Sequence, residues 1–333
     1  MSIKLGINGL GRIGKLVLRL TLAQNNIEVV HINDMMNTEL MAHLLKYDSI
    51  HGKLNASVTF DDNHIIINDK PIRVTNATQP TEIPWEETGT EFVVDSSGRF
   101  KTYSTLEGHL KHGVKKVVLS CPPDDYSIER VVVMGVNQNT ILPSDRIISN
   151  ASCTTNCVAI MLKVLLNEFG IENAFMNTIH PTTNNQNLQD GYHSDYRRAR
   201  SAINNIIPTT SSAVRSVHRI FPELKEKFKG FATRIPILDC SYAEVCAMLQ
   251  KEVTRNDIIS AFQKYSSDPQ MCNFLEFTQD PIVSSDITDN PHSAIFDALA
   301  TQILGNRFIQ ILGWYDNEYG YSSRTIDLIN YIA

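Results

Sequence analysis

Cys153 lies in a segment, Ser149 to Cys157 (SNASCTTNC), where a helix is expected to begin. A strand-like run precedes the segment, and a helical pattern from Cys153 to Glu168 follows it. At a helix N-terminus the dipole favours the thiolate, so we expect the pKa of Cys153 to be lowered and its sulfur to be nucleophilic. Backbone N–H groups of the same turn would stabilise an oxyanion. This setting predicts covalent catalysis by Cys153.

His180 is the best candidate for the general base that such a thiol needs. It closes a strand-like run and precedes Pro181, which favours an extended backbone before it. The other histidines lack this setting: His31 lies inside an apolar strand, and His109 and His112 lie on a polar helix. A lone histidine is usually structural, but its position at the end of a strand favours a catalytic role for His180.

The other cysteines do not suggest a second chemical centre. Cys157 lies one helical turn beyond Cys153 and is expected to be a packed thiol. The spacing fits neither a zinc site nor a disulfide framework, so we expect no metal and free thiols in a reducing cytoplasm. Four cysteines are expected to be small buried hydrophobes: Cys121, Cys240, Cys246 and Cys272.

Three glycines, Gly9, Gly11 and Gly14, follow the first predicted strand and open the first predicted helix. In this context the G-x-G-x-x-G spacing is typical of a dinucleotide site. The first glycine permits a tight turn, the second a close approach to a pyrophosphate, and the third the packing of helix on strand. The phosphates would then bind free N–H groups at the helix N-terminus.

Asp34 ends the second predicted strand, twenty residues after Gly14. A carboxylate there is expected to bond the adenosine ribose hydroxyls and to repel the extra phosphate of NADP. Met35 and Met36 supply no cation for that phosphate, so NAD is favoured. The alternative is a generic glycine turn, with an aspartate that only caps the next segment.

The elements that position these residues differ between the two halves of the chain. In the first half, apolar strands alternate with helices, which predicts a parallel sheet covered on both faces. Residues 57–75 look instead like antiparallel strands joined by polar turns. After about residue 152 the strands become longer and alternating. We therefore predict an α/β Rossmann cofactor domain, residues 1–151, and an α+β catalytic domain, residues 152–317, with a large mostly antiparallel sheet.

Composition excludes several classes of partner. The 333 residues carry a formal net charge of -6, which argues against nucleic acid or an anionic membrane as the main partner. The N-terminus lacks the pattern of a signal peptide, and no apolar run approaches the roughly 20 residues that span a bilayer. A cytoplasmic protein is expected.

Four segments resemble the glyceraldehyde-3-phosphate dehydrogenase family, and the resemblance extends over essentially the whole chain. They are residues 6–14 (GINGLGRIG), 45–52 (LKYDSIHG), 151–157 (ASCTTNC) and 314–321 (WYDNEYGY). The resemblance implies a Rossmann domain, a catalytic α+β domain and a homotetramer. It also implies that the C-terminal helix, residues 318–333, packs back on the cofactor domain.

The resemblance assigns roles residue by residue. Cys153 matches the family nucleophile, His180 its base, and Asn317 the asparagine that orients the nicotinamide carboxamide. One anion pocket, for the substrate phosphate, is implied at Thr183 and Arg234; the other, for inorganic phosphate, at Ser152, Thr154 and Ser211, with Arg198 near both. Positions that match cofactor contacts are Arg12, Ile13, Asp34, Ser97 and Ser120.

The implied reaction is the NAD-dependent, phosphorylating oxidation of D-glyceraldehyde 3-phosphate to 1,3-bisphosphoglycerate, a step of glycolysis and gluconeogenesis, through a thioester on Cys153. Ser211 and Ser212 depart from the usual Thr-Gly of the family, which puts the inorganic-phosphate loop in doubt. Residues 191–193 and 290–295 look more like erythrose-4-phosphate dehydrogenase, the non-phosphorylating sister enzyme of pyridoxal phosphate biosynthesis; Thr183 favours the triose enzyme. A non-catalytic binding protein is a third reading, against which Cys153 and His180 argue.

Overall fold

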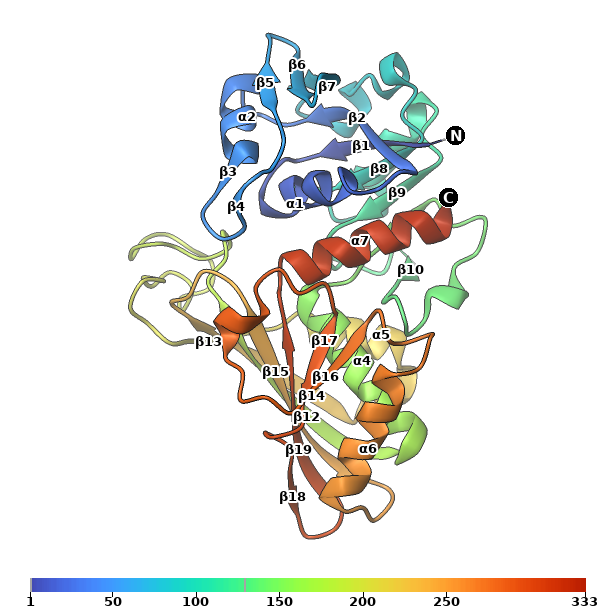
Figure 1. Cartoon of the computed structure of the whole chain (residues 1–333), viewed down its shortest axis with the longest axis vertical. Helices are drawn as coiled ribbons and strands as arrows, with labels where there is room; N and C mark the ends of the chain where they lie inside the picture. The colour runs from blue at the N-terminus through green and yellow to red at the C-terminus, as the bar shows by residue number, and fades with distance from the viewer. Residues whose placement is uncertain (1, 129) are drawn as a thin grey trace. The chain divides into compact units, whose positions relative to one another are not determined.

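The computed structural model describes residues 2–128 and 130–333 (Figure 1). The chain forms two compact units. The first unit comprises Met1–Val132, Gln138–Ala151 and Ser322–Ala333, and the second comprises Val133–Asn137 and Ser152–Tyr321. Each unit is built around one large sheet, and each is described by itself below.

The sheet of the first unit has nine strands in the order β10-β11-β9-β8-β1-β2-β7-β6-β5. Neighbours from β10 to β7 run parallel, whereas β7, β6 and β5 are antiparallel, as predicted for residues 57–75. The strands are β1 (Ile3–Asn8), β2 (Ile27–Asn33), β5 (Val58–Phe60), β6 (His64–Ile67), β7 (Lys70–Thr75), β8 (Phe92–Asp95), β9 (Lys116–Leu119), β10 (Arg130–Val131) and β11 (Ile147–Ser149). A separate two-stranded ribbon joins β3 (Tyr47–Asp48) to β4 (Gly52–Lys53).

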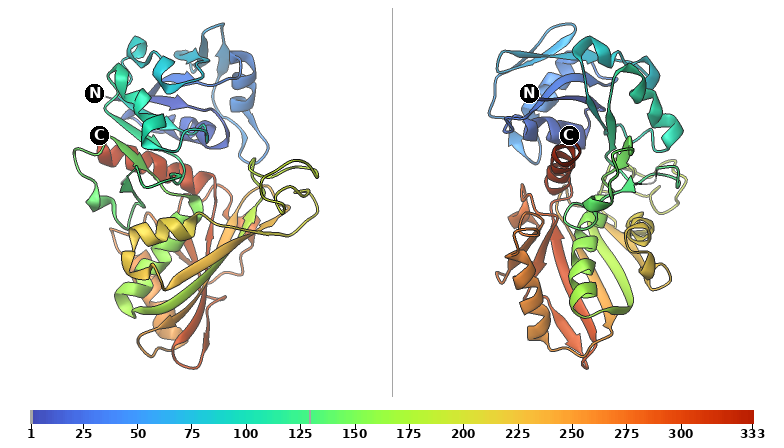
Figure 2. Two further views of the ribbon diagram at one scale, coloured as in Figure 1. Left: turned by 180° about the vertical axis from the view of Figure 1, so that it is seen from behind. Right: turned by 90° about the vertical axis from the view of Figure 1, so that its right-hand side faces the viewer.

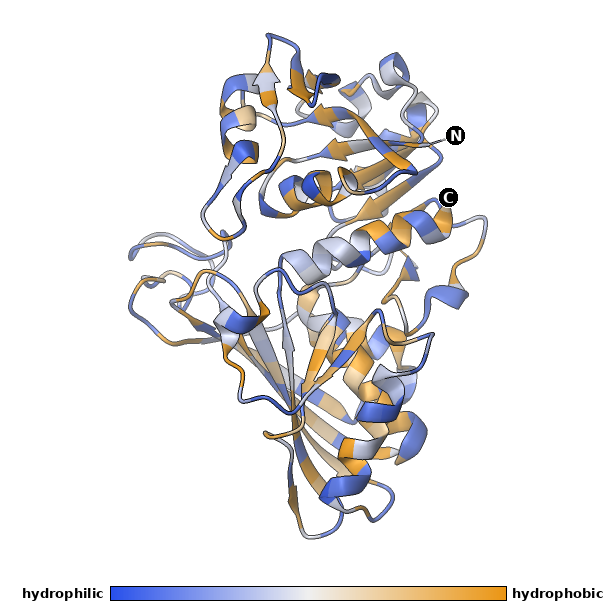
Figure 3. Ribbon diagram, viewed as in Figure 1, coloured by the Kyte–Doolittle hydropathy of each residue, from blue (hydrophilic) through white to orange (hydrophobic). Residues whose placement is uncertain are grey.

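Both faces of the parallel sheet are covered, because every residue of β8 and β11 is buried. The hydropathy colouring shows much of β8 and of the neighbouring β9 as hydrophobic (Figure 3). The helices of this unit are α1 (Arg12–Thr21), α2 (Thr38–Lys46), α3 (Tyr103–Leu106) and most of α7 (Tyr319–Ile332).

Within the first unit, α7 is tied to residues far away in the sequence. Asn150 Nδ2 donates to Thr325 Oγ1 at 3.0 Å, and Asn26 Nδ2 donates to Asn330 Oδ1 at 2.8 Å. Leu328 and Ile329 are fully buried. These contacts anchor the end of the chain in the cofactor unit.

The sheet of the second unit has the order β13-β14-β12-β15-β19-β17-β16, with β18 paired to β19. It is mostly antiparallel; only β12/β14 and β16/β17 run parallel. The strands are β12 (Ile171–Pro181), β13 (Ile207–Thr209), β14 (Phe228–Ile235), β15 (Ser241–Leu249), β16 (Leu275–Thr278), β17 (Ala294–Asp297), β18 (Gln302–Leu304) and β19 (Phe308–Tyr315).

Three helices lie against one face of this sheet: α4 (Cys153–Glu168), α5 (Ala213–Ile220) and α6 (Arg255–Ser266) (Figures 1 and 2). Strand β15 alternates buried and half-buried residues, because its two faces differ. One face of the sheet packs against the helices, and the opposite face carries exposed side chains such as Phe175 of β12 and Phe231 of β14. In the part of the chain that the structure describes, no helix is long and apolar enough to cross a membrane.

Candidate active site

The turn before α4 presents Cys153 at the first residue of the helix, as the sequence predicts. Ala151 has φ 55°, a left-handed conformation that costs a non-glycine residue about 1 kcal/mol or more. Ser152 is the N-cap, and its Oγ accepts a bond from Thr155 N at 3.1 Å. The cap starts the helix at Ser152, so that Cys153 is its first residue.

His180 lies near the end of β12, and its Nε2 is 3.4 Å from Cys153 Sγ. The histidine is 4% exposed, so its ring is held by surrounding protein. Its Nδ1 lies 2.9 Å from the carbonyl oxygen of Pro181. The predicted nucleophile and base are therefore brought together by the start of a helix and the end of a strand.

Arg234 completes this group from the neighbouring strand, because β12 and β14 run parallel with His180 opposite Arg234. Its Nη1 lies 2.5 Å from His180 Nδ1 and donates to Pro181 O at 2.8 Å. The structure gives this guanidinium only neutral acceptors among the described residues. A cation so placed favours the binding of an anion.

The electrostatics of the group differ from the sequence-based expectation. Burial raises the pKa of Cys153, and the positive charge of Arg234 and bonds from Thr154 offset this only in part. The expected lowering was wrong because burial, the largest cause, disfavours the charged thiolate. Burial, and then the charge of Arg234, lower the pKa of His180 to about 3. Both groups are neutral in this arrangement.

Tyr315 was not predicted from sequence, and it bonds the residue that follows the nucleophile. Its hydroxyl bonds Thr154 Oγ1 at 2.9 Å and Thr178 Oγ1 at 2.7 Å, and the residue is 1% exposed. The hydroxyl of Thr154, expected in a phosphate pocket, is thus engaged inside the protein. The signal for Tyr315 in the sequence was its place in the segment of residues 314–321.

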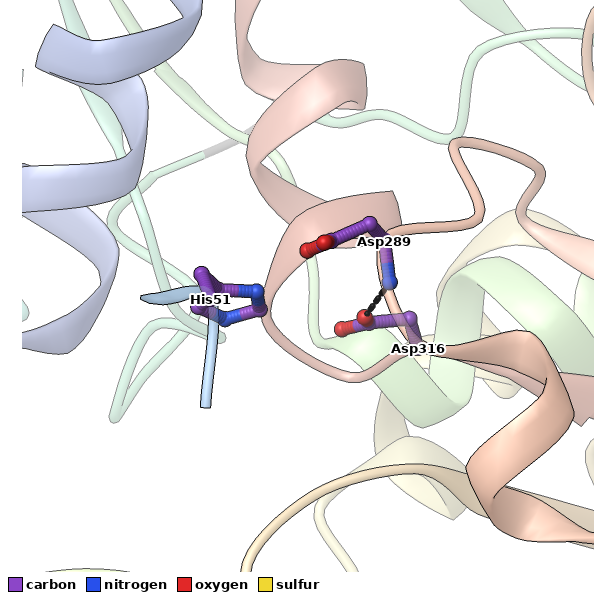
Figure 4. A group of neighbouring side chains, drawn as sticks. All are labelled: His51, Asp289 and Asp316. Carbon is purple, nitrogen blue, oxygen red and sulfur yellow. Dashed lines mark hydrogen bonds between the residues drawn. The ribbon is translucent and has the colours of Figure 1, made fainter. Parts of the chain in front are cut away.

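Asn317 follows β19, and its Oδ1 accepts a bond from Ser241 Oγ at 2.8 Å. The adjacent Asp316 accepts bonds from three backbone N–H groups: Asp289 at 2.8 Å, Glu318 at 2.9 Å and Tyr319 at 2.7 Å (Figure 4 shows the first). These bonds fix the turn that carries Asn317 into α7.

The remaining phosphate-site candidates lie on loops of the second unit. Arg198 Nε donates to Thr209 Oγ1 at 2.8 Å, and its charge lowers the pKa of Arg234, after the larger effect of burial. Thr183 is exposed, and Ser211 Oγ accepts a bond from Ala213 N at 3.3 Å. No hydrogen bond joins Thr183 or Ser211 to Arg234 among the described residues.

Ser212, the departure from the family glycine, has φ -68° and ψ -15°. Any residue adopts this right-handed conformation, so the serine introduces no backbone strain. The loop before α5 therefore does not require a glycine at this position.

In the first unit, the three glycines occupy the positions that a dinucleotide loop needs. A Cβ on Gly14 would lie 2.0 Å from the carbonyl oxygen of Gly9, and Gly9 itself has φ 93°. A Cβ on Gly11 would meet nothing within 4 Å, and Gly11 is the N-cap of α1 with no side-chain cap. Gly9 and Gly14 are thus required by the turn, while Gly11 leaves open space at a helix N-terminus. This fits a bound pyrophosphate.

The other cofactor candidates surround the same strand ends. Asp34 accepts bonds from Leu10 N at 2.6 Å and Met36 N at 2.9 Å, which fixes its carboxylate beside the loop. Arg12 pairs with Asp48 through two bonds of 2.5 and 3.0 Å. Ile13 follows Arg12 in the first turn of α1, and Ser97 and Ser120 lie just beyond β8 and β9.

The thiols differ in part from expectation. Cys157 is buried and its Sγ lies 3.5 Å from Gly313 O, as a packed thiol should. Cys240 is buried too, but Cys121, Cys246 and Cys272 are only half-buried. The prediction of burial was wrong for these three; Cys246, for example, lies on the half-buried face of β15.

Comparison with known proteins agrees with this geometry. Residues 3–103 match the NAD binding domain of glyceraldehyde 3-phosphate dehydrogenase, and residues 152–317 match its C-terminal domain. The chain belongs to the glyceraldehyde-3-phosphate dehydrogenase family. It is 45% identical to the glyceraldehyde-3-phosphate dehydrogenase of Streptomyces coelicolor and 43% identical to that of Priestia megaterium, in each case over 100% of this chain and 99% of the relative.

Glyceraldehyde-3-phosphate dehydrogenase 1 of Bacillus subtilis is 42% identical to this chain, again over 100% of this chain and 99% of the relative. These names support the triose reading of the sequence, and nothing in the comparisons favours the tetrose alternative. Membership confirms an NAD-binding domain joined to a catalytic domain, hence an oxidoreductase of this family.

Proposed function

We propose that this protein oxidises D-glyceraldehyde 3-phosphate with NAD and inorganic phosphate to 1,3-bisphosphoglycerate. The observation that carries the proposal is the 3.4 Å approach of Cys153 Sγ to His180 Nε2 beside the Arg234 guanidinium. A thiol with a base and an adjacent cation suits an aldehyde that bears a phosphate.

The chain's own groups supply the acid–base and covalent steps. Cys153 sulfur bonds to the aldehyde carbon as the thiol proton passes to His180, and His180 gives this proton to the carbonyl oxygen, which becomes a hydroxyl. His180 then takes the hydroxyl proton as hydride leaves that carbon, which gives a thioester on Cys153. NAD, when bound, supplies the hydride acceptor. An oxygen of inorganic phosphate attacks the thioester carbonyl, and the Cys153 thiolate leaves.

The two anions of this reaction are assigned to separate groups. Arg234 and Thr183 bind the phosphate of the aldehyde, and Ser152, Thr154 and Ser211 bind inorganic phosphate, with Arg198 close to both. In the structure the Thr154 hydroxyl is bonded to Tyr315, and the Thr154 backbone amide bonds Cys153.

The cofactor is assigned to the glycine loop and its neighbours. Gly9, Gly11 and Gly14 with Arg12 and Ile13 hold the pyrophosphate, Asp34 the adenosine ribose, and Ser97 and Ser120 lie alongside. Asn317 orients the nicotinamide carboxamide. The open space at Gly11 and the fixed carboxylate of Asp34 support this assignment.

A homotetramer that acts in the cytoplasm is also proposed. Within the described part of the second unit, no helix packs over the sheet face that carries Phe175 and Phe231, and the loop of residues 182–206 exposes Leu188, Tyr192 and Ile206. A second copy would bury this apolar surface. Six free thiols agree with a reducing compartment.

The test measures NADH formation with glyceraldehyde 3-phosphate and with erythrose 4-phosphate, each with and without inorganic phosphate. We expect phosphate-dependent turnover of the triose and its loss in Cys153→Ser. His180→Asn should lower kcat by roughly 10²–10⁴-fold. A preference for the tetrose that does not depend on phosphate would contradict the proposal. Unchanged turnover in Cys153→Ser would exclude a thioester on Cys153.

A further inference from the structure

The order of strands in the sheet of the first unit reverses between β1 and β8. The strands that follow β1 in the chain lie on one side of it, first β2 and then β7, whereas β8 lies on its other side with β9 beyond. In open α/β sheets a dinucleotide binds outside the carboxyl ends of the strands at such a reversal. Asn8 and Asp95, the last residues of β1 and β8, are paired in register there.

The side chains at this reversal are buried and bonded to one another. Asn8 Nδ2 donates to Asp95 Oδ2 at 2.7 Å. Asn33, the last residue of β2, donates from its Nδ2 to Asn8 Oδ1 at 2.9 Å. The asparagines are 3% and 4% exposed and the aspartate is fully buried. One row of hydrogen bonds therefore joins the carboxyl ends of β8, β1 and β2.

Asp95 is the charged residue of this row. Its Oδ2 also accepts a bond from His109 Nε2 at 3.1 Å, and its Oδ1 accepts bonds from the backbone N–H of Ser97 at 3.1 Å and from the Ser97 hydroxyl at 2.7 Å. No lysine or arginine pairs with this carboxylate in the part of the chain that the structure describes. A buried carboxylate without a cation depends on neutral donors, so each of these bonds matters for its position.

Trp85 fixes His109 as one of these donors. The indole Nε1, which can only donate, lies 3.1 Å from His109 Nδ1. Nδ1 must therefore accept, so the ring proton lies on Nε2, where it meets Asp95. Both rings are fully buried, with centroids 5.8 Å apart. The histidine thus offers the carboxylate a neutral N–H group in one fixed orientation.

Asp95 connects His109 to residues of the proposed cofactor site. Its carboxylate holds the side chain and the backbone of Ser97, and its backbone oxygen accepts a bond from Ser120 N at 2.9 Å. The backbone of Ser97 in turn lies against Gly9, since a Cβ on that glycine would be 2.6 Å from Ser97 N and Cα. A shift of the carboxylate would therefore move the loop after β8 against the glycine loop.

We propose that His109 is a positioning residue for NAD: through Asp95 it holds the loop after β8 in the conformation that receives the pyrophosphate and the nicotinamide half of the cofactor. The adenosine half is assigned to Asp34 at the end of β2, and separate bonds from Leu10 N and Met36 N hold that carboxylate. Loss of His109 should therefore weaken NAD binding and spare its adenosine half. The inference rests on the proposed cofactor site.

The test is calorimetric titration of the parent and two variants with NAD and, separately, with AMP, which carries only the adenosine and one phosphate. His109→Asn keeps an acceptor near Trp85, but its side chain is too short to donate to Asp95. The Kd for NAD should rise by roughly tenfold, the effect of one hydrogen bond to a charged group, and the Kd for AMP should stay close to that of the parent. His109→Gln reaches further with an N–H donor and should recover most of the affinity.

Leu106→Ala is the matched control for a loss of packing. Leu106 is fully buried in the same apolar cluster as Trp85, and its side chain forms no hydrogen bond. The variant should lower the melting temperature and leave both Kd values unchanged. Should His109→Asn not fold, Asp95→Asn replaces it: whichever way the new amide turns, its NH₂ group faces N–H donors, so NAD should again bind more weakly while AMP does not.

The outcomes separate this inference from the proposed function, because binding is measured without turnover. An unchanged Kd for NAD in His109→Asn, or an equal loss for NAD and AMP, would overturn the positioning role and leave the NADH assay untouched. An equal loss in Leu106→Ala would also overturn it, since packing alone would then explain the effect. A parent that bound no NAD would overturn the proposed function together with this inference.

Discussion

Ser241 Oγ donates to the amide oxygen of Asn317 at 2.8 Å, and both side chains are buried. Ser241 begins β15 and Asn317 follows β19, two strands that pair antiparallel with Ser241 opposite Tyr315. Because an amide has an oxygen on one side and an NH₂ group on the other, this bond fixes which one is left for a ligand. The NH₂ group of Asn317 is directed away from Ser241, where it can donate to a carbonyl.

Ser241→Ala should therefore weaken the orientation of the nicotinamide. One lost hydrogen bond is worth about 1 kcal/mol, so we expect the KM for NAD to rise or kcat to fall by roughly fivefold. Ser241→Thr keeps the hydroxyl and should restore most of the loss. Steady-state kinetics with varied NAD checks this, together with the stereospecificity of hydride transfer from deuterated NADH. Unaltered kinetics and stereospecificity in Ser241→Ala would contradict the role.

Alanine substitutions at two glycines of the loop should have different effects, one on stability and one on NAD binding. Gly14→Ala places a methyl group against the backbone oxygen of Gly9, so the unfolding free energy should fall by about 1–3 kcal/mol. Gly11→Ala meets nothing in the protein and should fold normally, yet its methyl group fills the space a pyrophosphate would approach. Denaturant unfolding and NAD titration measure both variants. Equal affinity for NAD in Gly11→Ala and the parent would show that the phosphates bind elsewhere.

Buried histidines should make the protein sensitive to mild acid. Burial, and then the charge of Arg73, lower the pKa of His31 to about 4, and its side chain is fully buried between Thr75 and Thr88. The unfolded chain takes up this proton near pH 6.5 and the folded chain only near pH 4, so stability falls as pH drops through that window. The loss from His31 alone is about 3 kcal/mol.

His31→Gln should flatten the dependence of unfolding free energy on pH between 6.5 and 4. Urea unfolding at a series of pH values measures it, and His64→Gln, on the partly exposed histidine of β6, controls for the loss of a histidine. Identical slopes in the parent and His31→Gln would refute the assignment.

Ser212→Gly tests the departure from the family loop. Since Ser212 has an ordinary right-handed backbone and makes no capping bond, glycine should only add freedom to the unfolded chain. Thermal unfolding should show a loss of about 0.5–1 kcal/mol. The KM for inorganic phosphate should stay close to that of the parent, because both residues offer the same backbone amide. A large fall in that KM would mean that the serine side chain obstructs the site.

His109 shows where pattern reading fails. The sequence placed it on a polar helix, but it lies fully buried in a 3-10 helix, Glu107–His112. Trp85 Nε1 donates to its Nδ1 at 3.1 Å, so Nε2 carries the proton and donates to Asp95 at 3.1 Å. Asp95 Oδ1 in turn accepts hydrogen bonds from the backbone N–H and the hydroxyl of Ser97. Local polarity could not reveal this network, because its partners are distant in the chain.

Short-range patterns were sufficient for the elements and for the chemical groups. Apolar runs and their spacing predicted the parallel sheet, the antiparallel segment of residues 57–75 and a helix that begins at Cys153. These features depend on neighbouring residues, which pack within one strand or one helical turn. The glycine spacing likewise predicted a loop in which Gly14 must lack a side chain.

Tertiary structure alone decided how those groups act on one another. Arg234 reaches His180 because β14 pairs with β12, and Tyr315 reaches Thr154 because β19 lies beneath α4. It also reversed the expected shift in the pKa of Cys153, since burial is the largest cause and opposes the thiolate. A sequence names the residues of a site, but burial and contacts between distant strands set their protonation.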